Sequence, residues 1–222
     1  EGAFLRQISM KDVWGLRAQA DSRGRIYIEE GVLDPKDPRY VLKKFAPDLS
    51  LAVEMARFPA PSPTEVDPLA PMSSWVIDDD DRLVYGYPKA YQISVFGPGD
   101  KVVLRIERPY DPVEITEAEI EEQRKEFPPE LMGETKVVFG KYHSAYQRVF
   151  LSDRGHIFVE TWEKTKDGKI LHDLFDPEGR FIGRIPLAKG GIEIRAGKYY
   201  ALEEDADGYE SLKRYSVEWK FE

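Results

Sequence analysis

The sequence contains no cysteine and no asparagine, and it has only three histidines. Without cysteine there can be no disulfide, no thiolate metal site and no cysteine nucleophile. The motifs HExxH, GxSxG and Walker A, and the glycine pattern of dinucleotide-binding proteins, are also missing. The sequence therefore lacks the common signatures of a catalytic site.

Long apolar runs and a basic face are missing as well. No apolar run approaches about 18 residues, the length that a membrane-spanning helix needs. The formal net charge is −9, whereas binding to nucleic-acid phosphates needs clustered basic residues. We therefore expect no transmembrane segment and no nucleic-acid partner. No signal-peptide pattern is present, and because the chain begins at Glu1 without a methionine, we expect further sequence upstream.

Aromatic residues are abundant, with 12 tyrosines, 11 phenylalanines and four tryptophans, which suits β-structure better than helix. They recur in one hairpin pattern. It reads YVLKKFAPDLSLAVEM at residues 40–55, YQISVFGPGDKVVLRI at 91–106, LHDLFDPEGRFIGRI at 171–185 and SLKRYSVEWKF at 211–221. Each first strand ends in an aromatic residue: Phe45, Phe96, Phe175 and Tyr215. We expect these four side chains to occupy one equivalent position and to be largely buried.

A second unit precedes each hairpin, at residues 16–28, 75–85, 148–159 and 192–202. It reads as a short apolar strand, a polar turn and an alternating strand. Gly24, Gly155 and Gly197 stand in the turns, where a positive φ costs glycine nothing. The two units together make four antiparallel strands, and a repeat of about 40–50 residues is typical of β-propeller blades. The sequence predicts an all-β propeller with about four blades, as a single domain over residues 1–222.

An insertion of roughly 30 residues interrupts the repeat between Glu107 and Phe139, and it carries one predicted helix, TEAEIEEQRKE at residues 116–126. Thr116 followed by Glu119 is a capping box. Pro128 and Pro129 should end the helix. Its apolar face is narrow, so we expect it on the propeller surface.

The two ends of the chain suggest an incomplete repeat. Residues 2–9, GAFLRQIS, match a fourth blade strand, whereas the last copy lacks a good one. Residues 4–8 either complete the last blade and close a four-bladed ring, or the chain is the C-terminal part of a larger propeller; we favour the second reading. An open blade edge also allows association with another chain.

The motifs DSRGRIYI at residues 21–28, SDRGHIFVETWE at 152–163, FDPEGRFIGRIPL at 175–187 and EEDADGYESLKRYSVEWK at 203–220 resemble the bacterial six-bladed β-propeller family, relatives of the NHL-repeat propellers. The resemblance covers nearly the whole chain. It implies six blades and an extracytoplasmic location, periplasmic or lipoprotein-anchored. The related propellers include inert scaffolds as well as metal-dependent lyases and lactonases.

Two acidic segments could be interpreted as cation-binding sites. Asp78, Asp79, Asp80 and Asp81 form a run of four acids, but they stand where the other copies have a turn, which is the reading we favour. Residues 203–208, EEDADG, begin like a calcium loop, but the first and twelfth positions hold Glu203 and Arg214 instead of Asp and Glu. We therefore expect a hairpin turn there.

His143 lies just before a first strand, where connections approach the central opening of a propeller. Tyr142, His143, Tyr146 and Arg148 are the candidate ligand-binding residues, although a packing or surface role is favoured over binding. His156 and His172 are expected to decorate blades.

Strong repeats without a catalytic motif favour a non-catalytic binding or scaffold module, with a protein or small molecule as its unidentified ligand. We expect no cofactor. The alternative is a metal-dependent lyase or lactonase-like hydrolase with Ca²⁺ or Zn²⁺ in the central channel. The predicted first strands carry few metal-ligating side chains, which favours the first hypothesis.

Overall fold

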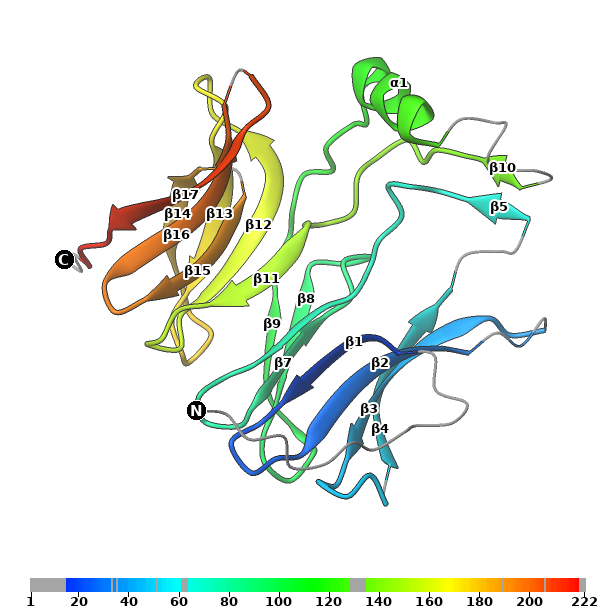
Figure 1. The fold of residues 1–222 in the computed structure, drawn as a ribbon, viewed down its shortest axis with the longest axis vertical. Coiled ribbons are helices and arrows are strands. Elements are labelled where there is room, and N and C mark those ends of the chain that lie inside the picture. Colours follow the sequence, from blue (N-terminus) through cyan, green and yellow to red (C-terminus); the bar gives the residue numbers. More distant parts are fainter. Residues whose placement is uncertain are drawn as a thin grey trace. The chain divides into compact units, whose positions relative to one another are not determined.

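The computed structural model describes residues 15–32, 34, 36–50, 52–60, 64–127, 135–188, 190–205 and 207–219 (Figure 1). The chain forms two compact units, residues 1–62 and 63–222, which are described one at a time. The expected single domain over residues 1–222 stays a prediction. The proposed N-terminal strand at residues 4–8 and the helix-ending Pro128 and Pro129 lie outside the described residues.

The first unit contains one four-stranded antiparallel sheet whose strands follow in chain order. Its strands are β1 Gly15–Ala20, β2 Ile26–Val32, β3 Arg39–Phe45 and β4 Ala52–Pro59. Tyr27, Val41, Leu42 and Phe58 are buried on it. The sheet lies where the repeat pattern predicts a blade, and its last strand extends beyond residue 55 to Pro59.

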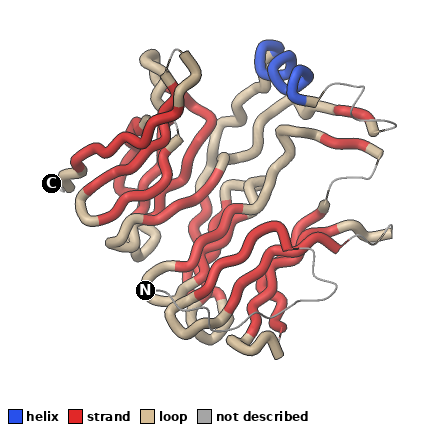
Figure 2. Tube along the Cα trace, in the orientation of Figure 1, coloured by secondary structure: helices blue, strands red, loops and turns tan. Residues whose placement is uncertain are grey.

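The second unit contains three more antiparallel sheets, drawn as red strands in Figure 2. The first consists of β6 Ser74–Ile77, β7 Leu83–Gly86, β8 Gln92–Phe96 and β9 Val102–Glu107; the second of β11 Arg148–Leu151, β12 Ile157–Lys164, β13 Ile170–Phe175 and β14 Phe181–Leu187; the third of β15 Gly191–Arg195, β16 Lys198–Glu204 and β17 Glu210–Ser216. A short parallel pair joins β5 Glu65–Val66 to β10 Lys136–Val137. Among the described residues, the third sheet has no fourth strand.

The first strands of these three sheets are neighbours. The Ser74 hydroxyl of β6 accepts a hydrogen bond from Val149 N of β11 at 2.7 Å and donates one to Val149 O at 3.3 Å. Ser152, which follows β11, forms a parallel bridge with Ile194 of β15. Successive four-stranded meanders that meet through their first strands are the blades of a β-propeller, so the predicted fold class is confirmed.

Two apolar clusters lie between neighbouring blades of the second unit. The first brings Ile93 and Val95 of β8 against Val149, Val159 and Phe175. The second packs Phe158 and Leu174 against Ile194, Tyr199 and Ala201. Because the β11–β14 blade is covered on both sides, its central strands are buried on both faces.

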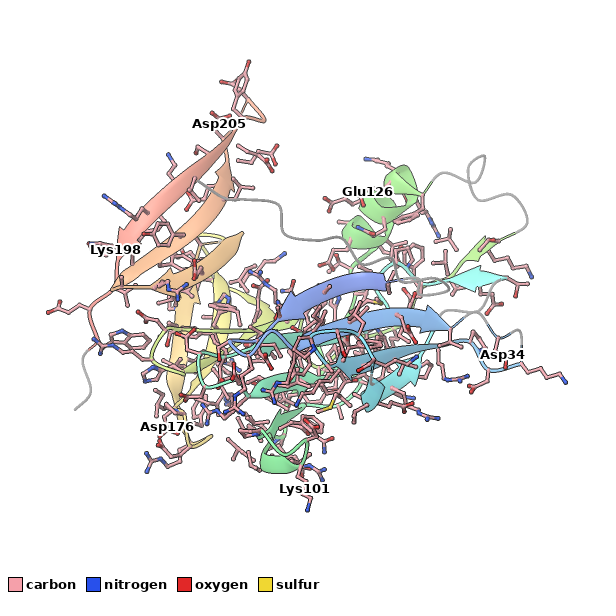
Figure 3. All side chains as sticks on the ribbon, turned by 60° about the horizontal axis from the view of Figure 1, so that its bottom comes forward. Asp34, Lys101, Glu126, Asp176, Lys198 and Asp205 are labelled. Carbon is pink, nitrogen blue, oxygen red and sulfur yellow. The ribbon has the colours of Figure 1, made fainter. Side chains whose placement is uncertain are left out.

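The polar turns between strands share one device. Asp78 Oδ1 accepts hydrogen bonds from the backbone N–H groups of Asp80 and Arg82, at 3.0 and 2.8 Å, and its Oδ2 accepts from Arg82 Nε at 2.6 Å. Asp176, labelled in Figure 3, binds Arg180 in the same way. The run of four acids is therefore a blade turn, as expected. Gly24, Gly155 and Gly197 have φ values of 72°, 74° and 66°, as the sequence predicts.

Three of the four repeated aromatic residues end the third strands of their sheets. Phe45 and Phe175 are buried and Phe96 is half-buried. The prediction is wrong for Tyr215, which is 42% exposed. Its register differs: Phe175 pairs with the first residue of its neighbouring strand, whereas Tyr215 pairs with the second, Tyr199. A one-residue shift turns a side chain to the opposite face of a sheet. The exposure of Tyr215 follows from its strand: β17 is the edge strand of its sheet within the described ranges, and all of its residues are exposed.

The helix α1 spans Glu117–Glu126 and is the one helix among the described residues (Figure 2). Thr116 is its N-cap, and Thr116 and Glu119 form the predicted capping box. None of its residues is buried, so it lies on the surface as expected. Within the described ranges, no helix is long and apolar enough to cross a membrane.

Candidate ligand-binding site

A pocket of about 330 Å³ lies in the second unit between the β6–β9 and β11–β14 blades. Its walls come from the residue before β8, the segment after β9, the segment before β11, and strands β12, β13 and β14. The lining residues are Tyr91, Arg108, Pro109, Tyr110, Asp111, Pro112, Val113, Ser144, Ala145, Thr161, Trp162, Glu163, Asp173 and Arg184.

Asp173 of β13 is the most buried charge of this pocket, with 1% of its surface exposed. Its Oδ2 accepts a hydrogen bond from the Tyr91 hydroxyl at 2.7 Å. Its Oδ1 accepts one from Arg184 Nε at 2.7 Å and lies 3.1 Å from Arg108 Nη1. A buried carboxylate needs such partners, because leaving it unpaired would cost several kcal/mol.

Both arginines are held by further contacts. Arg184 Nη1 donates to the two carboxylate oxygens of Glu163, at 2.8 and 3.0 Å. The Arg108 guanidinium carbon lies 3.9 Å from the ring centroid of Phe181, a cation–π distance. The charged groups at this end of the pocket therefore have fixed positions.

The protonation states follow from the same contacts. Burial, followed by the charge and hydrogen bond of Asp173, raises the pKa of Tyr91 well above its usual range. The hydrogen bond to Asp173 raises the pKa of Arg184, although burial opposes it. Tyr91 and Arg184 are therefore permanent donors at neutral pH.

Trp162 of β12 forms an aromatic wall. The His143 ring stacks on the Trp162 ring at a centroid distance of 3.9 Å and an interplanar angle of 14°. Trp162 Nε1 donates to the Ser144 hydroxyl at 3.3 Å, and that hydroxyl donates to Tyr146 O at 2.8 Å. These contacts hold the indole plane, and Trp162 lines the pocket.

Two of the predicted site residues lie directly behind this pocket. His143 is buried; its Nε2 is 3.3 Å from Glu119 Oε2 of α1, and its Nδ1 has no hydrogen-bond partner among the described residues. Tyr146 is buried, donates to Gln92 O at 3.0 Å and packs edge-on against Tyr91. Both residues support pocket walls, and neither lines the pocket.

The other two predicted residues have different surroundings. Arg148 Nε pairs with Glu160 Oε2 at 2.7 Å, and the same carboxylate oxygen lies 3.3 Å from His172 Nε2. Tyr142 is exposed, with Lys141 Nζ 4.8 Å from its ring centroid. The structure thus brings His143 and Tyr146 to the pocket and places Arg148 and Tyr142 elsewhere. A ligand-binding role for the four residues stays a prediction.

The sequence reasoning missed the pocket residues, which come from six separate segments. One signal was available: Asp173 stands inside the apolar strand ILHDLF, and a charge in a strand of that kind must find partners when it is buried. His156 and His172, expected to decorate blades, are both buried on them.

Within the part of the chain that the structure describes, no group of three or more histidine, aspartate or glutamate side chains could hold a metal ion. Asp205 accepts from the backbone N–H groups of Asp207 and Tyr209 in the turn between β16 and β17. Figure 3 labels Asp205 at the end of that hairpin. The EEDADG segment is therefore a hairpin turn, as the sequence predicts.

No family model and no curated protein matches the chain. A member of the DUF4221 family from Bacteroides vulgatus is 9% identical with a TM-score of 0.48, over 90% of this chain and 63% of that structure. Virginiamycin B lyase from Staphylococcus aureus is 12% identical with a TM-score of 0.30, over 95% and 86%. A streptogramin B lyase structure is 8% identical with a TM-score of 0.28, over 96% and 86%. The chain thus spans about two thirds of the first structure, and likenesses this low assign neither a family nor an activity.

Proposed function

We propose that the chain is a non-catalytic β-propeller module that binds a ligand in the pocket around Asp173. The observation that carries this proposal is that the charged groups at the base of the pocket pair with one another across two blades. Such a set of fixed polar groups in a concave site orients a bound molecule.

Acid–base catalysis requires a side chain that can both gain and lose a proton at the working pH. A general acid or base works best when its pKa lies near the working pH. Here the pKa values of Tyr91 and Arg184 are both raised, away from neutrality, by burial in the first case and by the Asp173 hydrogen bond in the second. Neither Tyr91 nor Arg184 is therefore suited to proton transfer at neutral pH.

Membership of the six-bladed NHL-like family, with an extracytoplasmic location, is part of the proposal. It rests on the blade motifs, such as SDRGHIFVETWE at residues 152–163, and on the blades themselves. Fractionation of cells that produce the full-length protein tests the location. Recovery only from the cytosol would contradict it.

The metal-dependent lyase or lactonase remains the competing hypothesis, and no specific contact favours it. Thermal unfolding with and without Ca²⁺ or Zn²⁺ tests it, because a metal that binds the folded state raises the melting temperature. A metal-dependent rise together with hydrolysis or elimination of a lactone would replace our proposal.

The direct test is a ligand-observed NMR screen of the whole chain with a library of small metabolites and short peptides. We expect at least one binder that is recovered unchanged, and we expect Trp162→Ala to weaken its binding. Trp219→Ala is the matched control, because Trp219 stacks on His156 and does not line the pocket. Conversion of the bound compound to a product would overturn the proposal.

A further inference from the structure

The charge balance of the pocket restricts what it can bind. Arg108 and Arg184 face three carboxylates, those of Asp111, Glu163 and Asp173, so one formal negative charge remains. Both arginines already pair with carboxylates. An anionic ligand would have to break these pairs, and a wholly apolar ligand would strip water from charged groups without replacing its hydrogen bonds.

Fixed carboxylate and guanidinium groups suit neutral hydroxyl groups instead. Adjacent hydroxyls of a polyol can donate to the two oxygens of one carboxylate or accept from two guanidinium N–H groups, the two-point geometry that these planar groups favour. Glu163 and Asp111 are exposed at the pocket, and Asp111 has no polar partner among the described residues. The Tyr91 hydroxyl gives its one proton to Asp173 and can still accept a hydrogen bond from a ligand hydroxyl at the base of the pocket.

Aromatic rings border the same space. Trp162 is fixed by His143 and Ser144, and Tyr110 is 39% exposed with its ring centroid 6.3 Å from that of Tyr91. The C–H face of a sugar ring packs on such rings, because an aromatic face carries partial negative charge. The volume of about 330 Å³ is near the lower limit for small-molecule sites.

From these features we infer that the pocket binds a neutral polyhydroxylated ligand with one or two sugar rings. This inference rests on the proposed binding function and specifies its ligand class. A quaternary ammonium ion would also find aromatic rings and carboxylates here. An ammonium group could use the carboxylates and not the guanidinium N–H groups, whereas a sugar hydroxyl can donate to the first and accept from the second, which favours the neutral sugar.

The test uses the whole chain and isothermal titration with cellobiose, maltose, lactose and chitobiose as neutral probes. Glucuronate and choline serve as charged comparators. We expect a neutral disaccharide to bind with a Kd of about 1 mM or lower and each charged probe to bind at least about tenfold more weakly.

Three variants locate and characterise the binding. Tyr110→Ala should weaken the neutral sugar at least about tenfold, whereas Tyr209→Ala, an exposed tyrosine of the β16–β17 turn, should change the Kd less than about twofold. Asp111→Asn keeps the side-chain shape and removes one charge. It should weaken the neutral sugar by about threefold to tenfold, because one of the two acceptor oxygens is lost, and it would strengthen an anion.

The outcomes separate this inference from the proposed function. Absence of binding by every neutral probe up to about 10 mM, or tighter binding of glucuronate or choline, overturns the sugar inference. If glucuronate or choline binds more tightly and is recovered unchanged, the binding function stands. Cleavage of a bound sugar would overturn the non-catalytic function and leave the ligand class supported.

Discussion

The hydroxyl of Tyr91 donates a 2.7 Å hydrogen bond to Oδ2 of Asp173, and the two residues belong to neighbouring blades of the second unit. Tyr91 also packs against Phe175, two residues beyond Asp173, with ring centroids 6.5 Å apart. One side chain thus joins the apolar cluster between the blades to the polar base of the pocket.

Tyr91→Phe removes this donor and leaves the ring in place. We expect the free energy of unfolding to fall by about 1.5–3 kcal/mol, because a buried charge loses a hydrogen bond. Urea unfolding measures the change. Tyr209→Phe is the matched control and should change the free energy by less than about 0.5 kcal/mol, since Tyr209 is 72% exposed. An equal effect of both changes would contradict a special role for Tyr91.

Gly86→Ala should be destabilising by about 1–3 kcal/mol because of crowding. A Cβ on Gly86 of β7 would overlap the Tyr146 hydroxyl, whose oxygen donates to Gln92 O. Tyr146→Phe removes that oxygen, so the two changes together should cost less than the sum of their separate costs. Gly99→Ala is the control, because a Cβ there meets nothing within 4 Å. Strict additivity in the urea-unfolding cycle would refute the steric explanation.

Glu160 predicts a pH dependence of stability. Burial raises the pKa of Glu160, but the hydrogen bond from His172 and the contacts of Arg148 outweigh burial, so the pKa lies below its usual value. A carboxyl whose pKa is lowered by folding stabilises the protein above its ordinary pKa of about 4.3, and this contribution is lost as the pH falls through the folded value.

Glu160→Gln should therefore cost about 1–3 kcal/mol at pH 7. The difference from the original protein should shrink as the pH falls below about 4.3. Urea unfolding between pH 7 and about pH 3 measures both effects. Glu122→Gln, at an exposed position of α1, should show no such narrowing. A pH-independent difference would show that Glu160 acts only through packing.

The capping box of α1 predicts that substitution of Thr116 reduces the stability of this helix. Thr116→Ala should reduce the stability of the helix by about 1 kcal/mol, because the Thr116 hydroxyl accepts from Glu119 N at 3.2 Å. Amide hydrogen exchange across residues 117–126 measures it. Thr116→Ser retains the acceptor and should exchange at the original rate. Faster exchange in the serine variant would rule out the cap as the cause.

The strand β17 predicts association in solution. All of its residues are exposed, and its pairing with β16 is the only strand pairing it makes within the described ranges. An unpaired strand edge favours addition of another strand. We expect a mass above that of one chain at high concentration, reduced by Leu212→Lys. Val103→Lys on β9 is the control, because Val103 and Leu212 are both 63% exposed. A monomer at every concentration would contradict the prediction.

The sequence by itself determined the strands, the turns between them and the start of the helix. These are local properties: Asp78 bonds the backbone two and four residues on, Gly24 and Gly155 adopt positive φ, and Thr116 with Glu119 caps α1. Interactions over fewer than five residues leave a readable pattern in the sequence. The repeated aromatic pattern was reliable at Phe45 and Phe175 because each marks the end of the third strand of a blade.

The tertiary structure alone decided the pocket, the register of Tyr215 and the burial of both faces of β12. Tyr91 and Asp173 are 82 residues apart, and no spacing rule predicts that their side chains meet. Residues 157–161 of β12 are all buried, Glu160 among them, because blades pack on both sides of this strand. An alternating pattern predicts one buried face. The second face depends on a neighbouring blade, whose position follows only from packing.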